Sequence, residues 1–329
     1  MILLRNRKPV LSLLILSPAI AELLSGSAPP SEFFNPLGFL FLVLFYGCGS
    51  VLIREIVKRW DKDIPSIILL GAAYGVWEEG VVVKSFFDPN WVDLGILGVY
   101  GRWLDVNWVW AFSLTIYHSI FSITIPIVLV ELIFDEHSSS TWLGRKSLLL
   151  FSALFILTSI LLNAFLTAYQ PYFWQYALCF FLIFVLIFSS YKAPKTFSIG
   201  KLNPPSRKKL LFFGFTWTFS FFIIYWFTPY LLQSPLITIE IGILQIFLTI
   251  YYLSRFDWNN ADKNHFLALI FGLLSLFMLL APIQELDNPN RPDDTTGMSI
   301  VGVLFLIFFL FLWKRFNREL LLPRKSQLS

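Results

Sequence analysis

The chain has 329 residues, of which 57% are hydrophobic and only 14% are charged. Soluble domains carry about a quarter charged residues, and a mean hydropathy of +0.69 requires repeated apolar segments that cross a bilayer. The composition therefore excludes a soluble globular protein. The net charge of +4 lies in short connections and does not indicate nucleic-acid binding, and Cys48 and Cys179 offer no disulfide framework or zinc motif.

Apolar stretches of transmembrane length follow one another along the chain and predict an all-α, polytopic transmembrane helical bundle. The lipid bilayer is thus its first expected partner. About ten spans are predicted, at roughly 9–25, 36–56, 65–83, 107–134, 147–168, 173–191, 210–228, 235–254, 265–282 and 298–313.

The basic residues alternate with these spans. Of the 25 Lys and Arg residues, 22 fall in connections on one side, and only Lys84, Arg102 and Arg291 fall on the other. The positive-inside rule then places both termini in the cytoplasm of a cell that carries this multi-pass protein in its plasma membrane.

Two features concern how the chain is divided. A basic start followed by Val10–Leu16 and Ala19-Ile20-Ala21 also resembles a cleaved signal peptide, although a retained first helix is our expectation. The basic, proline-containing segment 192–209 reads as a cytoplasmic linker. It separates a six-span N-terminal bundle, residues 1–191, from a four-span C-terminal bundle with a basic tail, residues 210–329.

Charged side chains within a membrane are costly and mark functional sites, and here they gather in the first half of the chain. At about 1.5 Å rise per residue, Glu22, Glu78, Glu79 and His118 reach similar depths in the predicted outer half of the membrane. We expect Glu78, Glu79 and His118 to form the site, and Glu22 to join them.

Helical spacing adds detail to this site. Gly71, Gly75 and Glu79 recur every four residues, so Glu79 continues a small-residue strip that faces protein. Thr115, His118 and Ser122 share one face of the next helix. The candidates for supporting the site or contacting a substrate are therefore Thr115, Ser122, Glu22 and Lys84.

A separate inner cluster is predicted from Arg54, Glu55 and Glu131, because Glu131 lies far around its helix from His118. The charged run from Arg54 to Arg59 is interpreted as a solvated helix end with pairs at i,i+3 and i,i+4. The aromatic segment 84–106 is either a binding loop or lid, or a segment lying on the bilayer surface.

Tyr74-Gly75-Val76-Trp77-Glu78-Glu79, with Lys84 and then His118 on the next helix, resembles the Abi/CPBP group of intramembrane proteases, which includes the CAAX prenyl endopeptidases. The resemblance implies a buried site in which a glutamate activates water and a histidine assists. It also implies that a divalent metal could bind there, with Glu78, Glu79 and His118 as ligands. The match covers two spans and lacks the group's later HxxxN helix.

Three functions remain open from the sequence. The first is an intramembrane glutamate-dependent hydrolase, an enzyme of Abi/CPBP type, acting on a lipid or membrane-peptide substrate. The second is a proton- or cation-coupled transporter that uses the same carboxylates, with His118 as a relay. The third is a membrane assembly subunit without catalytic activity.

Overall fold

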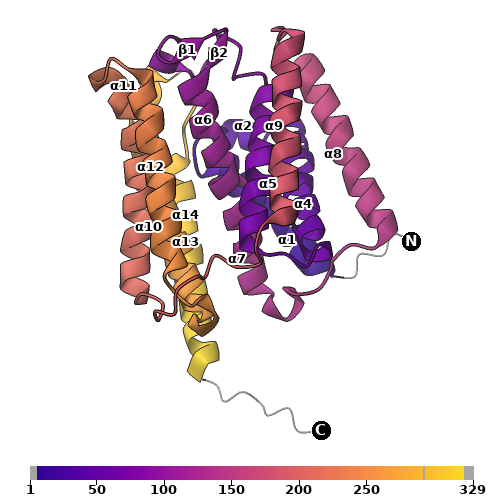
Figure 1. Ribbon diagram of the computed structural model, residues 1–329, viewed down its shortest axis with the longest axis vertical. Coiled ribbons are helices and arrows are strands. Elements are labelled where there is room, and N and C mark those ends of the chain that lie inside the picture. Colours follow the sequence, from indigo (N-terminus) through magenta and orange to yellow (C-terminus); the bar gives the residue numbers. More distant parts are fainter. Residues whose placement is uncertain (1–5, 292, 322–329) are drawn as a thin grey trace.

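The computed structural model describes residues 6–291 and 293–321, and its architecture is almost entirely helical (Figure 1). Arg5, Arg324 and Lys325, which contribute to the charge asymmetry above, lie outside these ranges. The elements up to the loop end of the bundle are α1 (Arg7–Pro18), η1 (Ala19–Leu23), α2 (Pro30–Phe33), α3 (Pro36–Leu42), η2 (Val43–Gly47), α4 (Cys48–Arg59), α5 (Ile64–Val76), η3 (Trp77–Val82), η4 (Gly95–Gly98), β1 (Arg102–Trp103) and β2 (Val106–Asn107).

The remaining helices continue to the end of the described chain. They are α6 (Trp108–Tyr117), η5 (His118–Thr124), α7 (Ile125–Ile133), η6 (Asp135–His137), α8 (Arg145–Phe165), α9 (Phe173–Lys192), α10 (Arg207–Phe222), η7 (Ile223–Phe227), α11 (Thr228–Leu231), α12 (Pro235–Ser254), η8 (Trp258–Asn260), α13 (Lys263–Leu286), η9 (Asn288–Asn290) and α14 (Met298–Leu321). Here η1, η2, η3, η5 and η7 are π-helical turns within longer helices.

Within the described residues, 8 helices are long and apolar enough to cross a membrane. The prediction of a helical membrane protein is therefore confirmed. The two other predicted spans are also continuous helices: α1 with η1, of 12 and 5 residues, and α5 with η3, which carries Glu78 and Glu79. The first is short, and the two glutamates lower the hydropathy of the second. Ten spans therefore stay a prediction.

Local sequence signals determine where α5 begins, the helix that continues into η3 with Glu78 and Glu79. Asp63 caps α5 by accepting a hydrogen bond of 3.1 Å from the amide of Ile64, and Pro65 occupies the first turn, where its missing amide hydrogen costs nothing. The helix then runs without a break into η3. Its start at Ile64 therefore fixes how far along the bundle Glu78 and Glu79 lie.

Glycines allow α5 to lie directly against the helix formed by α6 and η5. A Cβ atom on Gly71 would lie 2.9 Å from the carbonyl oxygen of Ser119, and one on Gly75 would lie 3.0 Å from the Cβ of His118. Neither position leaves room for a side chain without movement. The predicted strip is thus a helix–helix contact, and it brings the two site helices together.

The segment 84–107 closes one end of the bundle, which we call the loop end, with the short antiparallel hairpin β1–β2 (Figure 1). Phe86 and Phe87 are buried, whereas Trp103 is exposed. The Lys84 ammonium is buried and donates to the backbone oxygens of Asn163, Thr167 and Tyr169, at 2.8, 3.3 and 3.1 Å. The first residues of this segment are therefore packed into the protein and do not lie on a bilayer surface.

The two predicted halves share a hydrophobic core. In Figure 1 the helices α10, α12, α13 and α14 form one side of the molecule, and α8 and α9 lie at the other. The ring of Phe277 in α13 lies 6.2 Å from that of Tyr117 and 5.0 Å from that of Phe121. The C-terminal helices therefore support the helix that carries His118.

Candidate functional site

Four π-helical turns carry the polar residues of the site. Glu22 lies in η1, Tyr46 in η2, Glu78 and Glu79 in η3, and His118 in η5. A π-helical turn inserts an extra residue into an α-helix, and such turns are rare and occur frequently at functional sites. Their presence on four helices at one level of the bundle marks this level as the candidate site.

His118 joins the two glutamates. Its Nε2 lies 2.9 Å from Glu79 Oε1, and its Nδ1 lies 3.0 Å from Glu78 Oε2. Nδ1 also lies 3.0 Å from the hydroxyl of Ser122, one turn further along the same helix. All three members of the group, Glu78, Glu79 and His118, are at least 92% buried. The imidazole therefore bridges two carboxylates away from the molecular surface.

Glu78 is held from one side only. The Tyr46 hydroxyl donates a short hydrogen bond to Oε1, whereas Oε2 has an ion-pair contact with His118 and no geometric hydrogen bond within the described residues. The buried hydroxyl of Tyr74, one turn before Glu78, adjoins that carboxylate. Buried polar atoms are almost always paired, and here Tyr74 and Glu78 Oε2 form one buried polar group with His118.

Hydrogen bonds from residues near the loop end hold the Glu79 carboxylate in place. The Ser85 hydroxyl donates a short hydrogen bond to Glu79 Oε2, and the indole of Trp110 donates to the Ser85 oxygen at 2.9 Å. Its other oxygen faces His118, as described above. Every oxygen of Glu79 thus has a partner, which fixes its orientation against the imidazole.

The supporting candidates differ in where they lie. Glu22 is partly buried and interacts with Tyr46, His118 and Glu79, so it adjoins the site. The Thr115 hydroxyl donates to the carbonyl of Ala111 within its own helix at 2.7 Å. Lys84 donates to the carbonyl oxygens named above and not to either site glutamate. Among these residues, Ser122 contacts His118 directly, and Glu22 adjoins the cluster through Tyr46.

A divalent metal would require donor atoms that converge on one point. One donor atom each from Glu78, Glu79 and His118 lies within 4.8 Å of the others, and these are atom types that bind zinc. However, Glu78 contacts Nδ1 and Glu79 contacts Nε2. A single ion binds only one imidazole nitrogen, so a metal shared by the three residues would replace at least one of these two contacts.

Arg54, Glu55 and Glu131 form a second cluster, at the end of the bundle opposite the loop end. Arg54 Nε lies 2.9 Å from Glu131 Oε1, and its guanidinium donates to the carbonyls of Ser138 and Ser140, both at 2.6 Å. It also lies 3.7 Å from the ring centre of Trp142. Arg54 and Glu55 are fully buried, so the expectation of a solvated helix end is wrong here. Folding of the connection after α7 over α4 buries them.

Tyr46, Ser85 and Trp110 were not expected at the site. A single tyrosine in an apolar span gives no helical pattern of polar residues, and Ser85 and Trp110 meet Glu79 only because the chain turns back after η3. Tyr74 gave a weak signal, because it lies one turn before Glu78 on the same face. Such contacts depend on how separate helices meet, which spacing within one helix does not reveal.

Comparison with known proteins gives a single finding. A family model described as an uncharacterized membrane protein family matches residues 11–328. No curated protein and no solved structure matches the chain.

Proposed function

Because the chain belongs to this uncharacterized membrane protein family, we propose its function from the site alone: a membrane-embedded hydrolase that uses Glu78, Glu79 and His118. The observation that carries the proposal is the buried imidazole of His118 between the two carboxylates, with Glu78 Oε2 and the Tyr74 hydroxyl beside it. Together they offer a water molecule one acceptor and one hydroxyl partner at a carboxylate.

Each residue then has a role in general acid–base catalysis. Glu78 takes a proton from water as the resulting hydroxide equivalent attacks a carbonyl carbon of the substrate. His118 donates a proton to the leaving group, and Glu79 orients the imidazole and offsets its charge. Ser85 and Tyr46 hold the two carboxylates in position through their hydrogen bonds. The site is buried among apolar helices, so we propose a lipid or membrane-peptide substrate that enters from the bilayer.

The resemblance to the Abi/CPBP group supports the same class of reaction. Its Glu-Glu pair and the histidine of the next helix correspond to Glu78, Glu79 and His118. The present chain has Lys84 where that group has an arginine closer to the pair, and it lacks the HxxxN helix. The proposal therefore extends to a glutamate-dependent hydrolase and not to a particular protease specificity.

The test uses oxygen from water, which every hydrolase adds to its product. The purified protein would be incubated in H2 18O with vesicles from a total membrane extract, and new carboxyl groups would be detected by mass spectrometry. We expect labelled products with the wild type, a loss of at least about 100-fold with Glu78→Gln, and full activity with Glu240→Gln, an exposed glutamate of α12. Equal labelling in the wild type and in Glu78→Gln would contradict the proposal.

A second function is favoured by a different observation. The polar contacts run from Glu22 through Tyr46, Glu78 and His118 to Glu79, a chain that crosses four helices. Such a chain suits proton transfer in a proton- or cation-coupled transporter. Vesicles containing the protein and a pH-sensitive dye would distinguish the two functions. A proton flux that Tyr46→Phe abolishes, without any labelled product, would favour transport over hydrolysis. Absence of both activities would leave the assembly subunit.

A further inference from the structure

Two adjoining grooves lie where α14 ends and α1 begins. The first has a volume of about 360 Å³ and is lined by the end of α14, and the second, of about 460 Å³, lies against the start of α1 and the end of α7. They share Arg315, whose guanidinium donates to the carbonyl of Ile133 at 3.3 Å. The two grooves therefore bridge the N-terminal and C-terminal parts of the molecule, at the end opposite the loop end.

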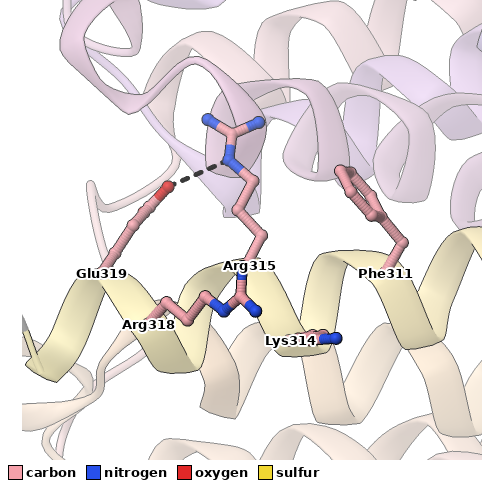
Figure 2. Close-up of a pocket in the computed structure, with 5 residues that line it drawn as sticks. All are labelled: Phe311, Lys314, Arg315, Arg318 and Glu319. Atoms are coloured by element: carbon pink, nitrogen blue, oxygen red, sulfur yellow. Dashed lines mark hydrogen bonds and ion pairs between the residues drawn. The ribbon is translucent and has the colours of Figure 1, made fainter.

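The side chains of the first groove share one face of α14. Figure 2 shows them on successive turns, with Arg315 turned toward a neighbouring element and joined to Glu319. The lining residues are spaced by three and four positions, as one helix face requires. They are Phe311, Lys314, Arg315, Arg318 and Glu319.

The charges of these grooves are unbalanced. Five cationic side chains line them, and all are exposed: Arg7, Lys8, Lys314, Arg315 and Arg318. Within the described part of the chain, only Arg315 among the five has an ion pair, with Glu319 at 2.9 Å. Glu319 and Asp135 are in addition bound by Lys263, at 3.1 and 2.7 Å. Glu136 also lines the second groove, so the two grooves hold five cationic and three acidic side chains, and four of the cations have no ion pair with any described residue.

An apolar track leads to this cationic seam. Leu304, Ile307, Leu310 and Phe311 of α14 are each more than half exposed, as expected of a surface that faces acyl chains. The cationic groups begin one turn beyond Phe311. A ligand with an anionic head and an apolar tail would match this order of surfaces, because its head would meet the cations while its tail lies along the helix.

We propose that this seam binds the phosphate headgroup of an anionic phospholipid, with Lys314 and Arg318 as its principal contacts. Arginine and lysine side chains form charge-assisted hydrogen bonds with phosphate oxygens, and basic pockets between helices at a membrane surface bind anionic lipids. Arg7 and Lys8 lie in the adjoining groove, so one headgroup would link the first helix to the last. This proposal does not depend on the hydrolase reaction.

The experiment titrates fluorescent phosphatidylglycerol into the full-length protein in neutral detergent. The double variant Lys314→Gln/Arg318→Gln removes two cations, and we expect it to weaken binding by about 30-fold. The matched control Arg145→Gln/Lys146→Gln removes two exposed cations from the start of α8 and should leave the affinity unchanged.

Two further arms identify the ligand. Phosphatidylcholine should bind at least about tenfold more weakly than phosphatidylglycerol, because its headgroup is neutral overall. Inorganic phosphate should not compete at the same concentration, because it lacks the tail. Equal weakening by both double variants, equal binding of the two lipids, or full competition by inorganic phosphate would each overturn the proposal of a phospholipid site.

Discussion

At the scale of single residues, Arg54 is the clearest case of a charge that the surrounding chain fully pairs. It contacts Glu131, Glu55 and three backbone carbonyls of the connection after α7. We predict that Arg54→Met destabilises the protein by about 3–5 kcal/mol, because Glu55 and Glu131 lose their fully buried cation and keep only the partly exposed Arg59 and Lys58 as ion-pair partners. Equilibrium unfolding would measure this change.

The matched control for Arg54→Met is Arg145→Met, which alters an exposed arginine in the first turn of α8. It should change the free energy of unfolding by less than about 0.5 kcal/mol. If both variants were equally stable, the Arg54 cluster would not hold the connection after α7 in place.

The residues of the candidate site show how much of it could be predicted from the sequence. Helical rise placed Glu78, Glu79 and His118 at one depth, and in the structure they touch. Because a charged side chain within a membrane is costly, these residues could be singled out from the sequence without knowledge of the fold. Burying Tyr46 or Ser85 in the membrane carries no comparable free-energy cost, since tyrosine and serine are common in membrane helices. Their roles follow only from the contacts between helices.

At the scale of elements, the contact between α5 and the α6–η5 helix depends on Gly71. A Cβ atom there would meet the backbone of Ser119 at 2.9 and 3.0 Å, and backbone cannot move aside as a flexible side chain can. We predict that Gly71→Ala lowers the midpoint of thermal unfolding by several degrees, since overpacking costs roughly 1–3 kcal/mol.

Gly98→Ala is the control for Gly71→Ala, because its nearest neighbour would lie 3.6 Å away, an ordinary contact distance. It should leave the thermal midpoint nearly unchanged. A midpoint for Gly71→Ala equal to that of the wild type would mean that the two helices do not pack as closely as described.

The helices and loops also show which parts of the fold could be predicted from the sequence and which could not. Long apolar helices were predictable because their hydrophobicity is a local property. The π-helical turns at the site were not, because they arise where helices must adjust to one another. The segment 84–106 was ambiguous for a related reason: aromatic residues suit both a bilayer surface and a protein interior. Burial of Phe86 and Phe87 places the first residues of the segment in the protein interior, whereas Trp103 is exposed.

At the scale of the whole molecule, we propose ten spans with both termini in the cytoplasm. The two ends of the bundle carry Ser139 and Thr296, both of which are exposed. Cysteines introduced at Ser139 and Thr296 should react with a membrane-impermeant maleimide from opposite sides, Ser139 only from the cytoplasm. The native Cys48 and Cys179 are buried and should stay unlabelled. Labelling of both positions from the same side would refute this topology.

His118 joins Glu78 through one ring nitrogen and Glu79 through the other. Nitrogen-15 NMR of the histidine-labelled protein in bilayers tests it directly, because the chain has 3 histidines and the His118 signals can be assigned by their loss in His118→Gln. We predict that Glu78→Gln mainly shifts the Nδ1 signal, that Glu79→Gln mainly shifts the Nε2 signal, and that Glu240→Gln shifts neither. His118 signals that are unchanged in all three variants would contradict it.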